Sequence, residues 1–234
     1  MNAIESTGLT KRFRGRTAVD DLNLTIAQGE FFALLGQNGA GKTTTIRMLT
    51  CLLAPSAGDA LLMGESITRN AEAAKAHSNL SPQETAIAQN LTVRENLMLI
   101  ARLYGANKAD ATGQAEAAMR EFGLSARARD RAKTLSGGMQ RRLSIAMALI
   151  TKPNVLFLDE PTLGLDVRAR RELWKTISAL KGKVTVVLTT HYLEEAEALA
   201  DRIGIMHEGR LQALGTAAEL CAKANATNFE DAFL

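Results

Sequence analysis

Apolar and polar residues are arranged along the chain in patterns that predict several strands. Leu22, Leu24 and Ile26 alternate with polar neighbours, which is the pattern of a half-buried strand. Later apolar runs lack this alternation, as expected for strands buried on both faces of a parallel sheet. These runs cover residues 31–35, 155–158, 184–190 and 203–206. Helical patterns lie between the runs, so the sequence predicts an α/β core with a mostly parallel sheet.

The middle of the chain, residues 84–150, has helical patterns and no convincing strand. Thr92 and Glu95 have the spacing of a capping box, which opens a helix. Gly123 follows an Ala- and Glu-rich stretch, in the position of a glycine that ends a helix. A further helix is predicted over residues 136–150. Together these helices predict an insertion within the α/β core.

Length and composition predict a globular chain with one large domain or two small ones. The chain has 234 residues, of which 46% are apolar and 23% are charged, and this composition excludes a disordered or fibrous chain. Along the chain we expect an α/β core over 1–83 and 151–220, a helical insertion over 84–150 and a short tail over 221–234.

Other bulk properties exclude further classes of protein. The longest apolar runs have five or six residues, whereas a membrane-spanning helix needs about 20, so we expect no spanning segment. The N-terminus lacks a basic region followed by an apolar stretch, and no secretory signal is expected. Cys51 and Cys221 fit no metal or redox spacing, and both thiols are expected to stay reduced. The net charge of +3 argues neither for nor against nucleic-acid binding.

Residues 36–43 read Gly-Gln-Asn-Gly-Ala-Gly-Lys-Thr and match the G-x-x-x-x-G-K-[ST] phosphate-binding loop. The loop follows a buried strand and precedes a helical run at 44–53, so its N–H groups and the helix N-terminus can attract phosphate. Lys42 is predicted to contact the β- and γ-phosphates, and the Thr43 hydroxyl to bind Mg²⁺. A glycine-rich turn without a ligand is the alternative. The predicted nucleotide-binding residues are Gly36, Gln37, Asn38, Gly39, Ala40, Gly41, Lys42, Thr43 and Thr44.

Two acidic residues, Asp159 and Glu160, follow the buried run 155–158. Functional groups of open α/β sheets gather at the carboxyl ends of strands. Asp159 is predicted to hold Mg²⁺ through its water shell, because Mg²⁺ keeps several waters and takes few carboxylates. Glu160 is predicted to polarise the attacking water as a general base. The alternative is a polar strand end that only starts a loop before Pro161.

The segment from Leu135 to Gln140 reads Leu-Ser-Gly-Gly-Met-Gln and resembles the LSGGQ-type signature of ATP-binding cassette (ABC) ATPases. Six motifs of this family occur here in family order, and the resemblance covers essentially the whole chain. It implies a single domain over 1–234, with a P-loop core, an N-terminal antiparallel β subdomain and the helical insertion. It also implies that this core binds ATP with Mg²⁺ and hydrolyses it by positioning and charge neutralisation.

The resemblance implies roles for further residues near the nucleotide. Phe13 occupies the position of an aromatic side chain that stacks on adenine; a core phenylalanine is the alternative. Gln83 matches the glutamine that contacts Mg²⁺ and the attacking water, and a solvated loop glutamine is its alternative. His191 matches the histidine that holds the γ-phosphate and orients the water, and the alternative is a surface or capping histidine.

The resemblance also implies a head-to-tail dimer with two ATP molecules at its interface. Ser136, Gly137, Gly138 and Gln140 would contact ATP held by the other subunit, which is a second copy of this chain or a paralogue. Asp166 matches the residue that runs along this interface. Simple helix N-caps are the alternative readings for Ser136 and for Asp166, and for Asp166 both roles can hold together.

Residues 190–197 and 228–234 resemble the ATPase subunits of ABC-2 type exporters, including the drug-resistance and sodium-efflux groups. This resemblance implies separate integral membrane permease subunits and a peripheral position at the cytoplasmic face of the cell membrane. No nucleic-acid partner is expected. Two alternatives remain: a soluble ABC-type ATPase that acts on nucleic acid or the ribosome, and a non-hydrolysing regulatory subunit.

Overall fold

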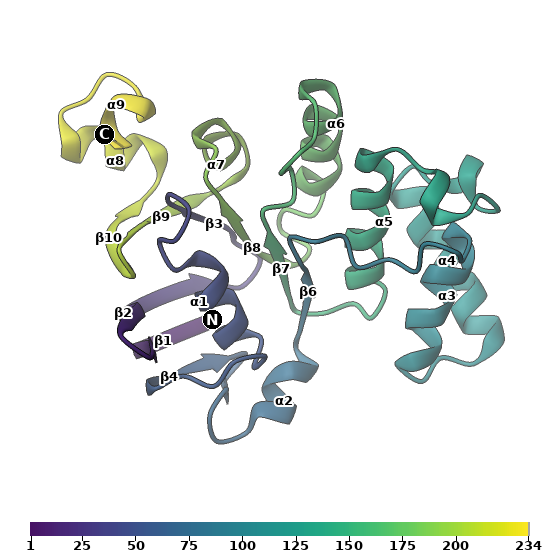
Figure 1. Cartoon of the computed structure of the whole chain (residues 1–234), viewed down its shortest axis with the longest axis horizontal. Helices are drawn as coiled ribbons and strands as arrows, with labels where there is room; N and C mark the ends of the chain where they lie inside the picture. Colours follow the sequence, from purple (N-terminus) through teal and green to yellow (C-terminus); the bar gives the residue numbers. More distant parts are fainter. Residues whose placement is uncertain (234) are drawn as a thin grey trace.

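The computed structural model describes residues 1–233, so Leu234, the last residue of the predicted tail, lies outside the described part. It contains two sheets (Figure 1). The first is antiparallel and has the order β2(Arg16–Ala27), β1(Asn2–Phe13), β4(Ala57–Leu62), β5(Glu65–Ser66). The second has the order β10(Arg210–Gly215), β9(Arg202–His207), β3(Phe31–Leu35), β8(Thr185–Thr190), β7(Val155–Asp159), β6(Ser78–Ser81). All its neighbours are parallel except β10 and β9.

The helices gather mainly at two ends of the molecule. Figure 1 shows α3, α4 and α5 at one end and α8 and α9 at the other. The helices are α1(Lys42–Leu49), α2(Ala71–Ala76), α3(Val93–Leu103), α4(Lys108–Glu121), α5(Gly137–Leu149), α6(Val167–Ser178), α7(Leu193–Leu199), α8(Ala217–Ala224) and α9(Phe229–Phe233). Over residues 1–233, no helix combines the length and the apolar character needed to cross a membrane.

Most of the predicted elements form where the patterns placed them. Thr92 and Glu95 make both hydrogen bonds of the capping box at the start of α3. Gly123 follows α4 with a φ of 64°, a left-handed conformation that glycine adopts without strain. The helix predicted over residues 44–53 extends too far at its C-terminal end. Helix α1 ends at Leu49, because Cys51 turns the chain with a φ of 55°.

The six-stranded sheet separates two buried apolar clusters. Alternate residues of β3 contribute to each, with Phe31, Ala33 and Leu35 on one face and Phe32 and Leu34 on the other. The second cluster packs the sheet against α1 and the antiparallel sheet. The two sheets therefore enclose α1 and fix the loop that precedes it.

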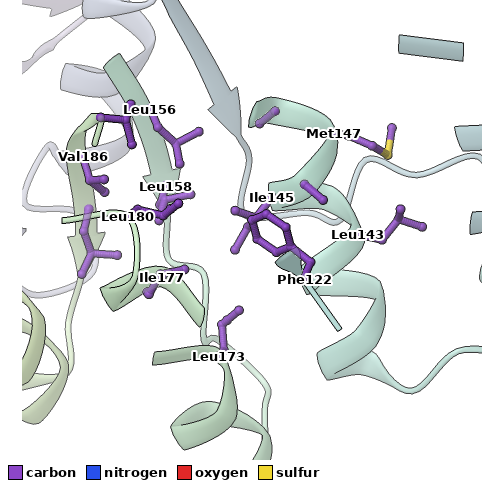
Figure 2. Close-up of a cluster of buried hydrophobic side chains, with 14 of the residues drawn as sticks. Phe122, Leu143, Ile145, Met147, Leu156, Leu158, Leu173, Ile177, Leu180 and Val186 are labelled. Carbon is purple, nitrogen blue, oxygen red and sulfur yellow. The ribbon is translucent and has the colours of Figure 1, made fainter. Parts of the chain in front are cut away.

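The first cluster continues from the sheet into the helical insertion (Figure 2). Leu143 and Ile145 of α5 are fully buried in the same cluster as Leu156 and Leu158 of β7. Removing such side chains from water contributes about 1.5–3 kcal/mol each. This continuous cluster packs α5 beside the end of β7, and the single domain stays a prediction.

Candidate active site

The phosphate-binding loop connects β3 to α1, and its glycines lie where no side chain fits. A Cβ atom on Gly36 would collide with the backbone carbonyl of Met206. A Cβ atom on Gly41 would collide with the carbonyl of Ala18, and Gly41 also has a φ of 105°. Gly41 caps α1 without a side-chain hydrogen bond, so the first N–H groups of the helix stay available to an anion. The loop is thus built for close approach of a phosphate to the backbone.

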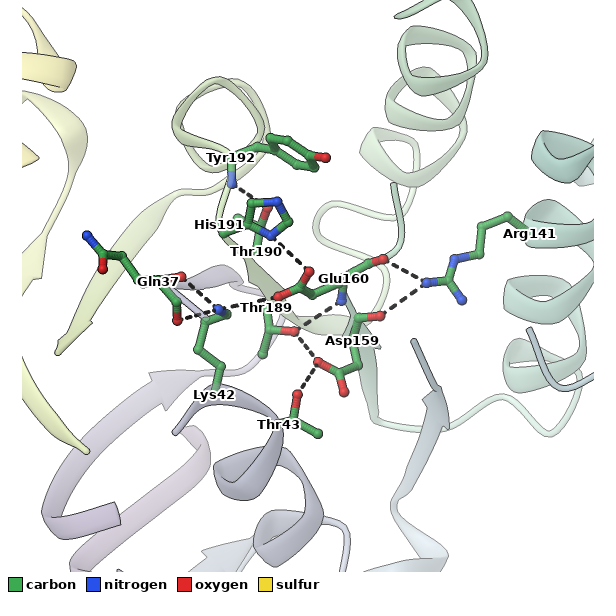
Figure 3. Close-up of polar contacts among 11 residues, drawn as sticks. Gln37, Lys42, Thr43, Arg141, Asp159, Glu160, Thr189, Thr190, His191 and Tyr192 are labelled. Atoms are coloured by element: carbon green, nitrogen blue, oxygen red, sulfur yellow. Dashed lines mark hydrogen bonds and ion pairs between the residues drawn. The ribbon is translucent and has the colours of Figure 1, made fainter. Parts of the chain in front are cut away.

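Lys42 holds its ammonium group inside this loop. Its side chain is only 4% exposed, and Nζ donates to the carbonyl oxygens of Gly36 and Gln37 at 2.7 and 3.2 Å. Nζ also lies 3.3 Å from Glu160 Oε1. The loop lysine and the predicted general base therefore share one site (Figure 3).

Asp159 and Thr43 meet at the carboxyl edge of the sheet, as predicted. The Thr43 hydroxyl donates to Asp159 Oδ1 at 3.2 Å, and the Thr189 hydroxyl donates to the same oxygen. A carboxylate and a hydroxyl are hard oxygen donors that suit Mg²⁺. Among residues 1–233 no group of three or more acidic, His or Cys side chains could hold a metal ion. The donor set therefore fits Mg²⁺ that is also bound by substrate phosphates, rather than a metal held by protein alone.

Glu160 has a strained backbone and a fixed side chain. Its φ is 45°, which is rare for a residue other than glycine and is typical of functional sites. Its N–H donates to Thr189 O and Thr189 Oγ1, both at 3.1 Å. His191 Nδ1 lies 2.9 Å from Glu160 Oε2, so Lys42 and His191 each hold one carboxylate oxygen.

A cavity of about 410 Å³ lies over the phosphate-binding loop. Phe13 is 49% exposed and lines this cavity, so the alternative of a core phenylalanine is excluded. Gln83, from the loop after β6, lines the same cavity. The predicted residues in its lining are Phe13, Asn38, Gly39, Gly41, Lys42, Thr43, Thr44, Gln83 and Glu160.

The signature segment lies outside the lining of this cavity. Ser136 and Gly137 are exposed at the N-terminus of α5. A Cβ on Gly138 would lie 3.2 Å from the Cβ of Ala169, so the N-terminus of α5 lies against that of α6. Asp166, the N-cap of α6, accepts a hydrogen bond from Ala169 N at 2.8 Å. The structure confirms both N-caps.

Gln140 stabilises the signature loop from within its own chain. Its Nε2 donates to the carbonyl oxygens of Ala132 and Leu135, both at 3.2 Å. These bonds use the N–H groups of the side-chain amide. The predicted contact of Gln140 with ATP in another subunit stays a prediction.

Two buried charged residues were missed in the sequence. Arg141 on α5 is 3% exposed, and burial lowers its pKa to about 10. Glu195 on α7 is fully buried, accepts a hydrogen bond from Trp174 Nε1 at 3.0 Å, and has a pKa that burial raises. The sequence does contain a signal that Arg141 is buried. Ile145 and Ala148 follow it at helical spacing, so they share its face of the helix, and both are buried.

The family model described as "ABC transporter" matches residues 19–163, which include the phosphate-binding loop, the signature segment and the two acidic residues. The chain belongs to the ABC transporter family. The match confirms the family inferred from the signature and its neighbouring motifs.

Individual relatives and a solved structure agree with the family. The daunorubicin/doxorubicin resistance ATP-binding protein DrrA of Streptomyces peucetius is 46% identical over 93% of this chain and 66% of its own length. The Nod factor export ATP-binding protein I of Paraburkholderia xenovorans is 44% identical over 94% of this chain and 73% of its own length. A structure described as the ATP binding subunit of an ABC transporter superposes with a TM-score of 0.86 at 29% identity, over 99% of this chain and 98% of that chain.

These comparisons confirm the predicted fold class and the prediction of an ATP-binding, ATP-hydrolysing ABC transporter subunit. They do not favour an ATPase that acts on nucleic acid or the ribosome. The chain spans about two thirds to three quarters of the length of the two relatives described above.

The N-cap of α6 in this ABC subunit gives a prediction about stability. Replacing Asp166 with alanine removes the bond to Ala169 N and is expected to lower the free energy of unfolding by about 1 kcal/mol. Asp166→Asn keeps an oxygen acceptor and should retain most of that stability. Urea unfolding of both variants measures the difference. Equal stability of Asp166→Ala and the parent chain would contradict the capping role.

Buried Glu195 gives a prediction about pH. Because burial raises its pKa above the usual 4.5, the ionised carboxylate destabilises the folded state at neutral pH. The protonated form of Glu195 contributes its full stabilisation of the folded state below pH 4.5. This stabilisation is lost as pH rises through the folded-state pKa. Glu195→Gln should therefore unfold at a higher temperature than the parent chain at pH 8, and this difference should shrink towards pH 4.5. Exposed Glu194→Gln is the control and should show no such trend. A difference independent of pH would contradict this account.

Proposed function

We propose that this chain binds Mg–ATP in the 410 Å³ cavity and hydrolyses it to drive export through separate membrane subunits. The observation that carries the proposal is the lining of that cavity, which combines the phosphate-binding loop with Phe13, Gln83 and Glu160. These residues come from four separate parts of the chain. Together they place an aromatic face, hydrogen-bond donors for phosphate and a carboxylate around one cavity.

The phosphate-binding loop provides the binding energy for the nucleotide. Backbone N–H groups of residues 36–43 and the N-terminus of α1 face the phosphates, and the Lys42 ammonium neutralises the β- and γ-phosphates. The exposed ring of Phe13 offers a π-face for adenine. Binding is thus divided between charge on the phosphates and stacking on the base.

Thr43, Asp159 and Gln83 are proposed to hold Mg²⁺ together with the phosphates. When bound, Mg²⁺ neutralises charge that develops on the β- and γ-phosphate oxygens. The hydrogen bond between Thr43 Oγ1 and Asp159 Oδ1 already brings two of these oxygen ligands together.

Glu160 is proposed to accept a proton from the water that attacks the γ-phosphorus. The new bond forms between that water oxygen and phosphorus, and the bond from phosphorus to the bridging oxygen of ADP breaks. His191 Nδ1 orients the carboxylate through its 2.9 Å contact with Glu160 Oε2. His191 is also proposed to contact the γ-phosphate.

A second subunit is proposed to complete the site. Ser136, Gly137 and Gly138 do not line the cavity of their own chain, and the first two are exposed. In a head-to-tail dimer they would cover the γ-phosphate held by the other subunit, with Asp166 along the same interface. The second subunit is another copy of this chain or a paralogue.

The membrane partners are proposed to be integral permease subunits, which place this chain at the cytoplasmic face of the cell membrane. The names of the two relatives refer to drug resistance and to Nod factor export. These names support an exporter of the ABC-2 type. The cargo would be selected by the membrane subunits.

Mixing two inactive variants tests the shared site. In a homodimer, Ser136→Arg disables both signature segments and Glu160→Gln disables both bases. A mixed dimer contains one site with an intact base from one chain and an intact signature from the other. We expect the mixture to recover up to about a quarter of the parent ATPase rate, because at most about half of the dimers are mixed and each mixed dimer has one intact site.

The control for the mixture is each variant alone at the same total concentration. Both should bind ATP and hydrolyse it very slowly. If the mixture shows no recovery although both variants bind ATP, a site shared between two copies of this chain is contradicted.

A further inference from the structure

Arg141 joins the signature helix to the two loops that carry Glu160 and Gln83. From α5, Nε donates to Pro161 O at 2.7 Å, and Nη2 donates to Asp159 O at 3.1 Å and Glu160 O at 2.8 Å. These three carbonyls are consecutive and lie at the end of β7. Figure 3 shows the guanidinium beside the backbone at Asp159 and Glu160.

The fourth contact reaches a different loop. Nη1 of Arg141 donates to Pro82 O, immediately before Gln83. One side chain therefore bonds the backbone next to the proposed base and the backbone next to the glutamine that lines the cavity. Since Arg141 is only 3% exposed, water does not compete freely for these carbonyls.

The contacts matter because the backbone at Glu160 is strained. A φ of 45° at a glutamate persists only where surrounding structure holds it. Consecutive carbonyl oxygens that point at one place repel one another, and a buried cation offsets that repulsion. The guanidinium is suited to this task because its five N–H groups point in fixed, separate directions.

We infer that Arg141 is a positioning residue for ATP hydrolysis, which holds the Glu160 turn and the Gln83 loop in fixed relation to the signature helix. Ser136 lies on the same helix, five residues before Arg141, or roughly 7.5 Å along the axis. Contact between the signature segment and ATP of the other subunit would then directly affect the position of Glu160 in this chain. This inference rests on the proposed role of Glu160.

The substitution Arg141→Lys is the sharpest test. Lys keeps the charge but offers one nitrogen, which cannot reach all four carbonyls on two loops. For the full chain, Arg141→Lys should lower kcat at least about tenfold, as small misplacements of catalytic groups do, while KM and Kd for ATP change less than about threefold.

Arg142→Lys is the matched control. Arg142 is the next residue on α5, and within residues 1–233 its side chain makes one hydrogen bond, to Phe122 O at 3.5 Å, which involves neither loop. Its kcat and KM should equal those of the parent chain. A normal kcat for Arg141→Lys would overturn the inference, as would an equal loss in both variants.

A double-mutant cycle separates positioning from general stability. If Arg141 acts through Glu160, adding Arg141→Lys to Glu160→Gln should lower the residual hydrolysis rate by less than about twofold. A full, independent loss in the double variant would overturn the inference.

Should Arg141→Lys fail to fold, the cycle is run with Arg141→Gln, whose neutral amide adds no unpaired buried charge. If neither variant folds, Arg141 is structural and the positioning role is overturned. The proposed function fails separately: a Glu160→Gln chain with the parent hydrolysis rate removes the base, whereas an inactive Glu160→Gln beside a fully active Arg141→Lys removes only this inference.

Discussion

Replacing Glu160 with glutamine should lower the rate of ATP hydrolysis by at least about a hundredfold, the usual contribution of a general base, and leave ATP bound. Glutamine has the same shape but cannot accept the proton of the attacking water. It also removes a negative charge 3.3 Å from Lys42 Nζ, so ATP affinity should be unchanged or higher. The variant is expected to accumulate as an ATP-bound dimer.

Single-turnover hydrolysis and gel filtration with ATP check this result. Glu194→Gln makes the same chemical change at an exposed position on α7 and should behave as the parent chain. Hydrolysis by Glu160→Gln at the parent rate would falsify the assignment of Glu160 as the base.

Replacing Lys42 with alanine should weaken ATP binding itself, by at least about tenfold. The ammonium supplies a charge-assisted contact to phosphate and also bonds the carbonyls of Gly36 and Gln37 within the loop. Its loss leaves the buried carboxylate of Glu160 without this cation. That carboxylate would then repel the phosphates.

Equilibrium titration with a fluorescent ATP analogue measures the effect, alongside the unfolding temperature of each variant. Lys152→Ala is the matched control, because Lys152 is exposed and lines a separate cavity at the amino edge of β7. A folded Lys42→Ala chain with unchanged affinity would contradict the phosphate-loop assignment.

The parts of the fold and site that could be predicted are those encoded by local sequence patterns. The runs at β3, β7 and β8 are apolar on successive residues because both of their faces are buried. The phosphate-binding loop and the pair at Asp159 and Glu160 are contiguous motifs, so their chemistry could be read before any tertiary contact was known. The N-caps at Ser136 and Asp166 were also local.

Features that depend on distant residues were missed. β6 reads Ser-Asn-Leu-Ser and is an edge strand identified by its pairing with β7 rather than by an apolar pattern. The alternation in β1 is interrupted by a register shift around Gly8, where φ is 60°. Arg141 was not identified as a functional residue, because its carbonyl partners lie 18 to 59 residues away in the sequence.

The most direct test of the account is purification of the tagged full chain from membranes of its own cells, followed by identification of its partners and measurement of ATP turnover. The account predicts a multi-span membrane protein in stoichiometric amount, and turnover that is abolished when the same complex carries Glu160→Gln. Recovery with ribosomes or nucleic acid and no membrane protein, or turnover unaffected by Glu160→Gln, would contradict it.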